Sequence, residues 1–94
     1  MTTAESEIYF YAFRYCLGRM TYCVSDFCRQ AKAKITEIGT HELELMDKEI
    51  TEAERQDNND RERQRYPKSL GMDCDRADWL ALRDVIRKEL ERRK

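Results

Sequence analysis

The stretch 9–22, with the sequence YFYAFRYCLGRMTY, decides how this chain begins to fold. It holds six of the chain's nine aromatic side chains and places one arginine before Gly18 and one after it. Aromatic rings stack on nucleobases and guanidinium groups bind phosphate, so this density of both is typical of a nucleotide site. A chain of 94 residues also needs most of these rings for its core, and both interpretations stay open at this point.

The sequence on both sides of this stretch is typical of α-helices. Pro67 is the only proline, and no alternation of apolar and polar residues is long enough to predict a strand. Glycine favours the left-handed conformation that ends helices, so Gly18 and Gly39 indicate two helix ends. We expect four helices, at about residues 5–17, 21–38, 41–55 and 75–92, and an irregular segment over 57–74.

Short polar residues set the expected boundaries of these helices. Thr21 and Thr40 can cap the second and third helices, and Asp75 can cap the fourth. The run Asp-Asn-Asn-Asp at 57–60 predicts a break after the third helix. Because only about three residues connect the first two helices, we expect an antiparallel hairpin. The sequence predicts one all-α domain over 1–94, and its thin core favours a compact protomer that oligomerises.

Charge is distributed unevenly along the chain, whose net charge is −1. Residues 39–60 carry eight acidic and two basic side chains, whereas residues 61–94 carry eleven basic and seven acidic ones. Binding of long nucleic acids needs a broad basic surface, so a net charge of −1 argues against such partners. A few arginines and lysines close together could still bind a small anion. The sequence has neither an apolar run long enough for a membrane nor a signal-peptide pattern, so we expect a cytosolic protein with reduced cysteines.

The residue types of catalytic and metal sites form no recognisable pattern. His41 is the only histidine, and no two of the four cysteines form a C-x-x-C pair. No serine or cysteine has a base partner in the sequence, and the aspartates within 57–75 lack the spacing of a calcium loop. We therefore expect no enzymatic activity, no metal and no cofactor.

A helical wheel divides the aromatic residues of the first helix into two groups. Tyr9, Phe13 and Cys16 share one face and can fill the core. Tyr11 and Tyr15 lie on a different side, where a second apolar face needs a second contact. That contact is either another subunit or a stacked ligand, and the two are compatible because ligand pockets often form between subunits.

Several arginine and lysine side chains can bind an anionic ligand. The alternative role of each is an ion pair with an acidic side chain at the protein surface. Arg14 and Arg19 flank the expected turn, where free N–H groups at Thr21 and Tyr22 would begin the next helix. The second helix adds two lysines, and the irregular segment adds a basic cluster that can close over a ligand or pair with the acidic third helix. The candidate ligand-binding residues are Tyr11, Arg14, Tyr15, Arg19, Thr21, Tyr22, Lys32, Lys34, Arg65 and Lys68.

The stretch 11–24 resembles the N-terminal part of the phage anti-CBASS sponge family, small proteins that sequester cyclic oligonucleotide signals. The pattern a-F-R-Y-x-L-G-R-x-T-Y-x-V carries the resemblance, which is good over 9–27 and loose beyond it, chiefly at Trp79. It implies a helical protomer that assembles into a homohexamer in the cytoplasm of a host bacterium. It also implies binding of cyclic dinucleotides, with cyclic trinucleotides as a second ligand class, without cleavage.

The resemblance assigns a role to one residue and leaves another open. Tyr11 matches the tyrosine that stacks on a base in the family. The lysine expected in the second helix has no counterpart near Asp26, so Lys32 or Lys34 would replace it. Two other classes of function stay open: a phage inhibitor that contacts a bacterial defence machine directly, like an anti-CRISPR protein, and a structural or regulatory helical oligomer.

Overall fold

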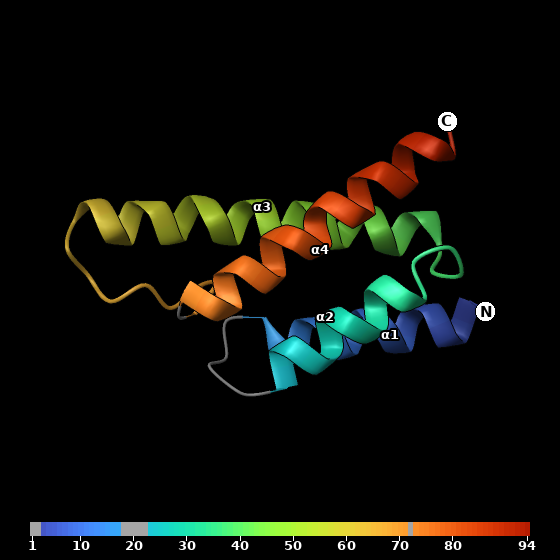
Figure 1. The fold of residues 1–94 in the computed structure, drawn as a ribbon, viewed down its shortest axis with the longest axis horizontal. Helices are drawn as coiled ribbons and strands as arrows, with labels where there is room; N and C mark the ends of the chain where they lie inside the picture. The colour runs from blue at the N-terminus through green and yellow to red at the C-terminus, as the bar shows by residue number, and fades with distance from the viewer. Residues whose placement is uncertain (1–2, 18–22, 72) are drawn as a thin grey trace.

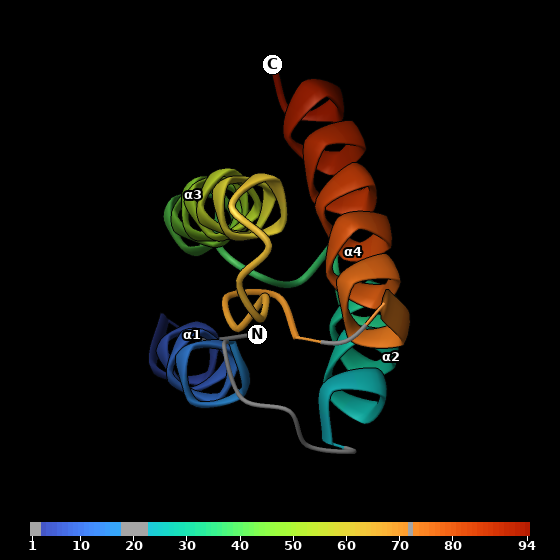
Figure 2. The ribbon, with the colours of Figure 1, turned by 90° about the vertical axis from the view of Figure 1, so that its left-hand side faces the viewer.

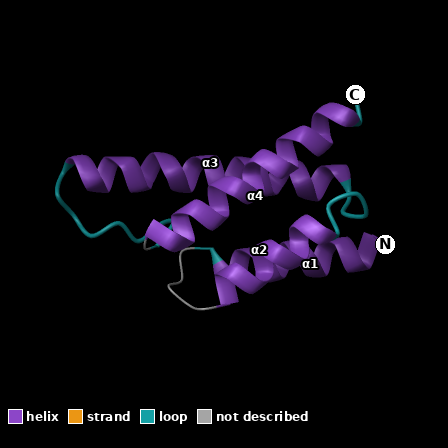
Figure 3. Ribbon diagram, in the orientation of Figure 1, coloured by secondary structure: helices purple, strands orange, loops and turns teal. Residues whose placement is uncertain are grey.

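The computed structural model describes residues 3–17, 23–71 and 73–94, which form four helices. Helix α1 spans Thr3–Cys16, α2 spans Cys23–Ala33, α3 spans Thr40–Glu62 and α4 spans Asp73–Arg92 (Figures 1 and 3). No strand occurs in the residues that the structure describes, so the predicted all-α class is confirmed.

The four helices surround one core, and each packs on two others. α2 packs on α4, α4 on α3, α3 on α1, and α1 on α2. Figure 2 looks at one end of this arrangement, with α1 and α3 on one side and α2 and α4 on the other. The expected turn at 18–22 lies outside the described residues, so the antiparallel hairpin of α1 and α2 stays a prediction, as does oligomerisation.

Aromatic rings from three helices meet at the centre of the core. The ring of Trp79 in α4 packs edge-on against Phe13 of α1, with 5.5 Å between centroids, and lies 5.9 Å from Phe27 of α2. Aromatic pairs of this kind contribute about 0.5–1.5 kcal/mol each beyond the burial of their surface. The surrounding buried apolar residues are Cys16, Val24, Cys28, Ala31, Ile38, Leu43, Met46, Ile50, Leu70, Leu82 and Ile86.

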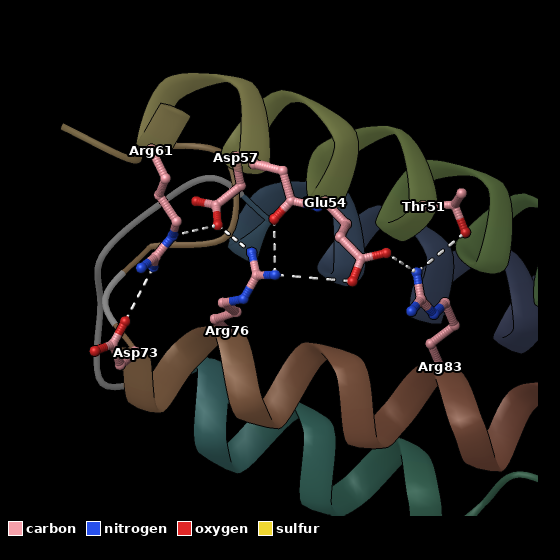
Figure 4. Close-up of polar contacts among 8 residues, drawn as sticks. Thr51, Glu54, Asp57, Arg61, Asp73, Arg76 and Arg83 are labelled. Carbon is pink, nitrogen blue, oxygen red and sulfur yellow. Dashed lines mark hydrogen bonds and ion pairs between the residues drawn. The ribbon is translucent and has the colours of Figure 1, made fainter. Parts of the chain in front are cut away.

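The predicted break at 57–60 is wrong, because α3 continues through it. Asp57 is fully buried, and its Oδ2 accepts hydrogen bonds from Arg61, 2.9 Å from Nε, and from Arg76 of α4 (Figure 4). Aspartate and asparagine favour breaks where their side chains can bond to nearby backbone. Here the Asp57 carboxylate is instead bound by two guanidinium groups, and the helix continues past it.

α2 is shorter than predicted, since it ends at Ala33 and residues 34–37 form turns. The carbonyl oxygens of Ile35 and Thr36 accept hydrogen bonds from Arg93 at the end of α4, at 3.2 and 3.3 Å. The backbone N–H groups of Ile35 and Glu37 donate to carbonyl oxygens only three residues earlier, those of Lys32 and Lys34, at 3.4 and 2.9 Å, so turns replace the α-helical pattern here. The predicted continuation of this helix to residue 38 is therefore wrong.

The starts of α3 and α4 also differ from the prediction. Gly39, rather than Thr40, is the N-cap of α3, and glycine has no side chain that could make the usual capping hydrogen bond. The Thr40 hydroxyl instead accepts a hydrogen bond of 2.9 Å from Arg93. α4 begins at Asp73, before the expected cap Asp75. The ends of α1 differ from the expected ones by one or two residues, which is the ordinary variation at helix termini.

We expect Asp57→Ala to lower the free energy of unfolding by about 3 kcal/mol, because two guanidinium groups lose their shared partner. Asp60→Ala is the matched control: Asp60 belongs to the same run, and its carboxylate accepts one hydrogen bond of 3.3 Å from Gln56. Its loss should cost about 1 kcal/mol or less. Urea unfolding measures both variants, and equal losses would contradict a special role for Asp57.

The last turn of α4 predicts a pH dependence. The buried Glu89 carboxylate accepts hydrogen bonds from Arg92 and Arg93, 2.9 Å from each Nε, which lower its pKa from 4.5 to about 2. A carboxyl group whose pKa is lowered by folding stabilises the fold above its unfolded pKa and loses this effect as the pH falls through the folded pKa. We expect the free energy of unfolding to decrease from about pH 5 to 2.

Glu89→Gln should remove part of this decrease, because the amide carries no titrating proton over that range. Urea unfolding of both proteins at a series of pH values measures the effect. The same slope with pH in the variant and in the original protein would show that Glu89 does not contribute.

Candidate ligand site between α1 and α3

An open pocket of about 320 Å³ lies between α1 and the beginning of α3. Its size is at the lower end of the range in which small ligands bind. It combines aromatic, basic and acidic side chains from two helices. The lining residues are Glu7, Phe10, Tyr11, Arg14, His41, Glu42 and Leu45.

α1 supplies a ring and a cation to this pocket. Tyr11 is 72% exposed and Arg14, one helical turn further on, is also exposed, so the two side chains share a face. Phe10 beside them stacks on the buried Phe13, with 5.9 Å between ring centroids, which connects this wall of the pocket to the core. The wheel's division of α1 is confirmed, since Phe13 is buried whereas Tyr11 and Tyr15 are exposed.

α3 supplies the opposite wall, and a hydrogen bond fixes where that wall begins. The backbone N–H of Gly39 donates to the Oγ of the buried Ser6 in α1 at 2.7 Å. A Cβ at position 39 would collide with Oε2 at the end of the flexible Glu42 side chain and would lie 3.1 Å from Ser6 Oγ, so the two helices approach closely here. The spacing of the two walls therefore depends on this contact.

The charges in the pocket are mixed. Arg14 has no ion-pair partner in the part of the chain that the structure describes, although Glu7 and Glu42 line the same pocket. An arginine without an ion pair keeps its planar fork of N–H donors available to phosphate or carboxylate oxygens. The pocket can therefore present a stacking ring and a guanidinium group to one ligand.

Among the residues that the structure describes, the other predicted ones do not line this pocket. Tyr15 is 64% exposed on α1 but does not line it. Lys32 is exposed on α2, and Lys34 pairs with Glu37 at 3.5 Å. Two further basic residues lie exposed between α3 and α4, away from the pocket lining: Arg65 and Lys68. The predicted turn residues Arg19, Thr21 and Tyr22 lie outside the described residues.

A second pocket, of about 460 Å³, lies along α3 and is a poorer site for an anion. Four of its lining residues are acidic: Glu44, Asp47, Glu49 and Glu52. The basic residues there are Lys48 and Arg87, and Asp47 already binds Arg87 at 3.0 Å. Repulsion from the carboxylates disfavours a phosphate at this position.

Cysteine and metal chemistry have little support among the described residues. Burial, together with the nearby Asp78, raises the pKa of the Cys28 thiol to about 12, so this thiol is protonated at neutral pH and is a poor nucleophile. No group of three or more histidine, cysteine or acidic side chains could hold a metal ion within residues 3–17, 23–71 and 73–94.

Comparisons of the chain with protein-family models, with curated proteins and with solved structures give no significant match. Across the described helices, none is both long and apolar enough to cross a membrane.

We expect Ser6→Ala to lower the free energy of unfolding by about 1–3 kcal/mol, because it leaves the Gly39 N–H at a partly buried helix end without its acceptor. Ser25→Ala is the matched control, because Ser25 is an exposed serine in the adjacent helix α2. Chemical unfolding of the two variants measures the difference. A loss of equal size in both would mean that the Ser6 contact is not specific.

Proposed function

We propose that this protein binds cyclic dinucleotides in the pocket between α1 and α3 and releases them unchanged. In this proposal it lowers the free concentration of the signal and thereby blocks CBASS antiphage signalling in the cytoplasm of an infected bacterium. The observation that carries the proposal is the exposed Tyr11 ring one turn from Arg14, which lacks an ion pair with the described residues. The resemblance of the stretch 9–27 to the sponge family supports the same function.

The chemistry of a cyclic dinucleotide matches this pair of side chains. A base stacked on an aromatic ring contributes about 1–3 kcal/mol, and the contribution tolerates different bases. A guanidinium group binds a phosphate through two parallel N–H···O bonds. Tyr11 would hold one base, and Arg14 would hold one of the two phosphates.

A tight complex needs more surface than one protomer offers. A dissociation constant of 1 nM corresponds to about −12 kcal/mol, which one stacked base and one phosphate contact do not reach. The proposal therefore includes a homo-oligomer, a hexamer by resemblance, in which a second copy covers the ligand. The exposed side chains of Ile8 and Tyr15 beside Tyr11 give α1 an apolar face that such a contact would bury.

Basic residues outside the pocket have a place in this assembly. Lys32, Lys34, Arg65 and Lys68 are exposed and can approach the second phosphate from a neighbouring copy. A cyclic trinucleotide carries three phosphates and would need a larger set of such cations than a cyclic dinucleotide.

Direct inhibition of a defence machine is the second candidate function, and the acidic surface of α3 favours it. Glu44, Glu49 and Glu52 line one pocket there and can imitate the phosphates of a nucleic acid. Capture of a nuclease complex by the protein, with no binding of any cyclic nucleotide, would support this function over the first.

We expect Tyr11→Ala to weaken binding of cyclic GMP–AMP by about 5- to 150-fold, since a base loses its stacking partner. Tyr11→Phe keeps the ring and should bind nearly as well as the original protein. Isothermal titration with cyclic GMP–AMP, cyclic di-AMP and cyclic tri-AMP, together with the solution mass, measures both affinity and assembly. Unchanged affinity in Tyr11→Ala, with an unchanged circular dichroism spectrum, would remove Tyr11 from the site.

Arg14→Ala should also weaken binding, and Arg29→Ala serves as its matched control. Arg29 is an exposed arginine on α2 that pairs with Asp26 at 3.0 Å and does not line the pocket. The nucleotide bound by the original protein should be recovered intact after denaturation. Recovery of linear products would identify an enzyme and contradict sequestration.

A further inference from the structure

Arg93, at the end of α4, binds the segment that leads into α3. Its Nη2 donates to the carbonyl oxygen of Ile38 at 2.8 Å, and to those of Ile35 and Thr36. Its Nη1 donates to the Thr40 hydroxyl at 2.9 Å. One guanidinium group therefore holds four acceptors spread over residues 35–40, so its contacts define the path of that connection.

The position of the Arg93 guanidinium is itself fixed. Its Nε donates to Glu89 at 2.9 Å, one turn earlier in α4, and the Glu89 side chain is buried. The Arg93 side chain is only 19% exposed, whereas that of the adjacent Arg92, which pairs with the same Glu89, is 63% exposed. Solvent screens an exposed pair strongly and a largely buried one much less.

The segment held by Arg93 is also held by α1. Directly after Ile38, the Gly39 N–H donates to Ser6 of α1. The next residues begin α3, and His41 and Glu42 line the pocket together with residues of α1. The first turn of α3 is thus fixed between a hydrogen bond to α1 and an arginine from α4.

We infer that Arg93 is a positioning residue for the pocket between α1 and α3. By holding the connection at 35–40, it sets where the α3 wall stands relative to Tyr11 and Arg14, although it does not line the pocket itself. The part of this inference that concerns ligand affinity rests on the proposed function. The part that concerns the position of α3 does not depend on any ligand.

Arg93→Ala tests the inference, with Arg92→Ala as the matched control on the same turn of α4. Hydrogen exchange measured by mass spectrometry on the unliganded 94-residue chain reports on the wall directly. We expect amide exchange over 36–43 and in α1 to be about tenfold or more faster in Arg93→Ala, and unchanged in Arg92→Ala. Arg93→Lys should exchange at an intermediate rate, because an ammonium group lacks the planar fork that spans several acceptors.

Titration with cyclic GMP–AMP gives the second measurement. We expect Arg93→Ala to bind about tenfold or more weakly than Arg92→Ala while both keep the helical circular dichroism spectrum of the original protein. Faster exchange at 36–43 with unchanged affinity would overturn the role of Arg93 in setting the pocket. If the original protein binds no cyclic nucleotide, the proposed function fails, and hydrogen exchange alone tests the role of Arg93. Faster exchange in Arg93→Ala that is confined to the connection between α2 and α3 and does not extend to α1 would then overturn the inference.

Discussion

The contact of Trp79 with Phe13 and Phe27 is the interaction on which the rest of the structure depends. It joins α4 to both N-terminal helices, although α4 and α1 stand diagonally across the core. Burial of this indole has a cost, because its Nε1 has no hydrogen-bond partner among residues 3–17, 23–71 and 73–94. The free energy gained by packing three large rings together exceeds the cost of the unpaired indole N–H. This gain matters because a small domain has little interior in which to bury apolar surface. Phe10 stacks on Phe13, so one wall of the candidate pocket is set by the same cluster.

Polar contacts determine how α3 and α4 align beside this core. Successive arginines along α4 form ion pairs with successively earlier residues of α3. Arg76 binds Asp57, Arg83 binds Glu54 at 2.8 Å and Arg87 binds Asp47 at 3.0 Å. Figure 4 shows the first two of these contacts. Partly exposed ion pairs of this kind add little to stability individually. Together, these ion pairs favour one antiparallel register of α3 and α4 over registers shifted along the helix axis. Contacts between uniform apolar faces would distinguish these registers less well.

Local sequence patterns predict the helices and their faces, whereas contacts between distant residues decide the ends and the site. Helical spacing alone separates buried Phe13 from exposed Tyr11. It does not predict that Asp57 is buried, because the arginine of α4 that binds it is 19 residues away in sequence. The sequence does not predict the α3 wall of the pocket for the same reason. His41 is an isolated histidine in the sequence, and it lines the pocket with Tyr11 because Gly39 contacts α1.

The series of contacts between α3 and α4 constrains which changes in length the chain can accept. An α-helix turns by about 100° per residue, so deleting one residue within α3 would rotate every later carboxylate away from its arginine. An insertion among residues 63–69, between the two helices, leaves the helical registers intact, and loop closure costs grow slowly with length. Among related chains, gaps in alignments should therefore concentrate in this loop, whereas α3 and α4 should keep constant length.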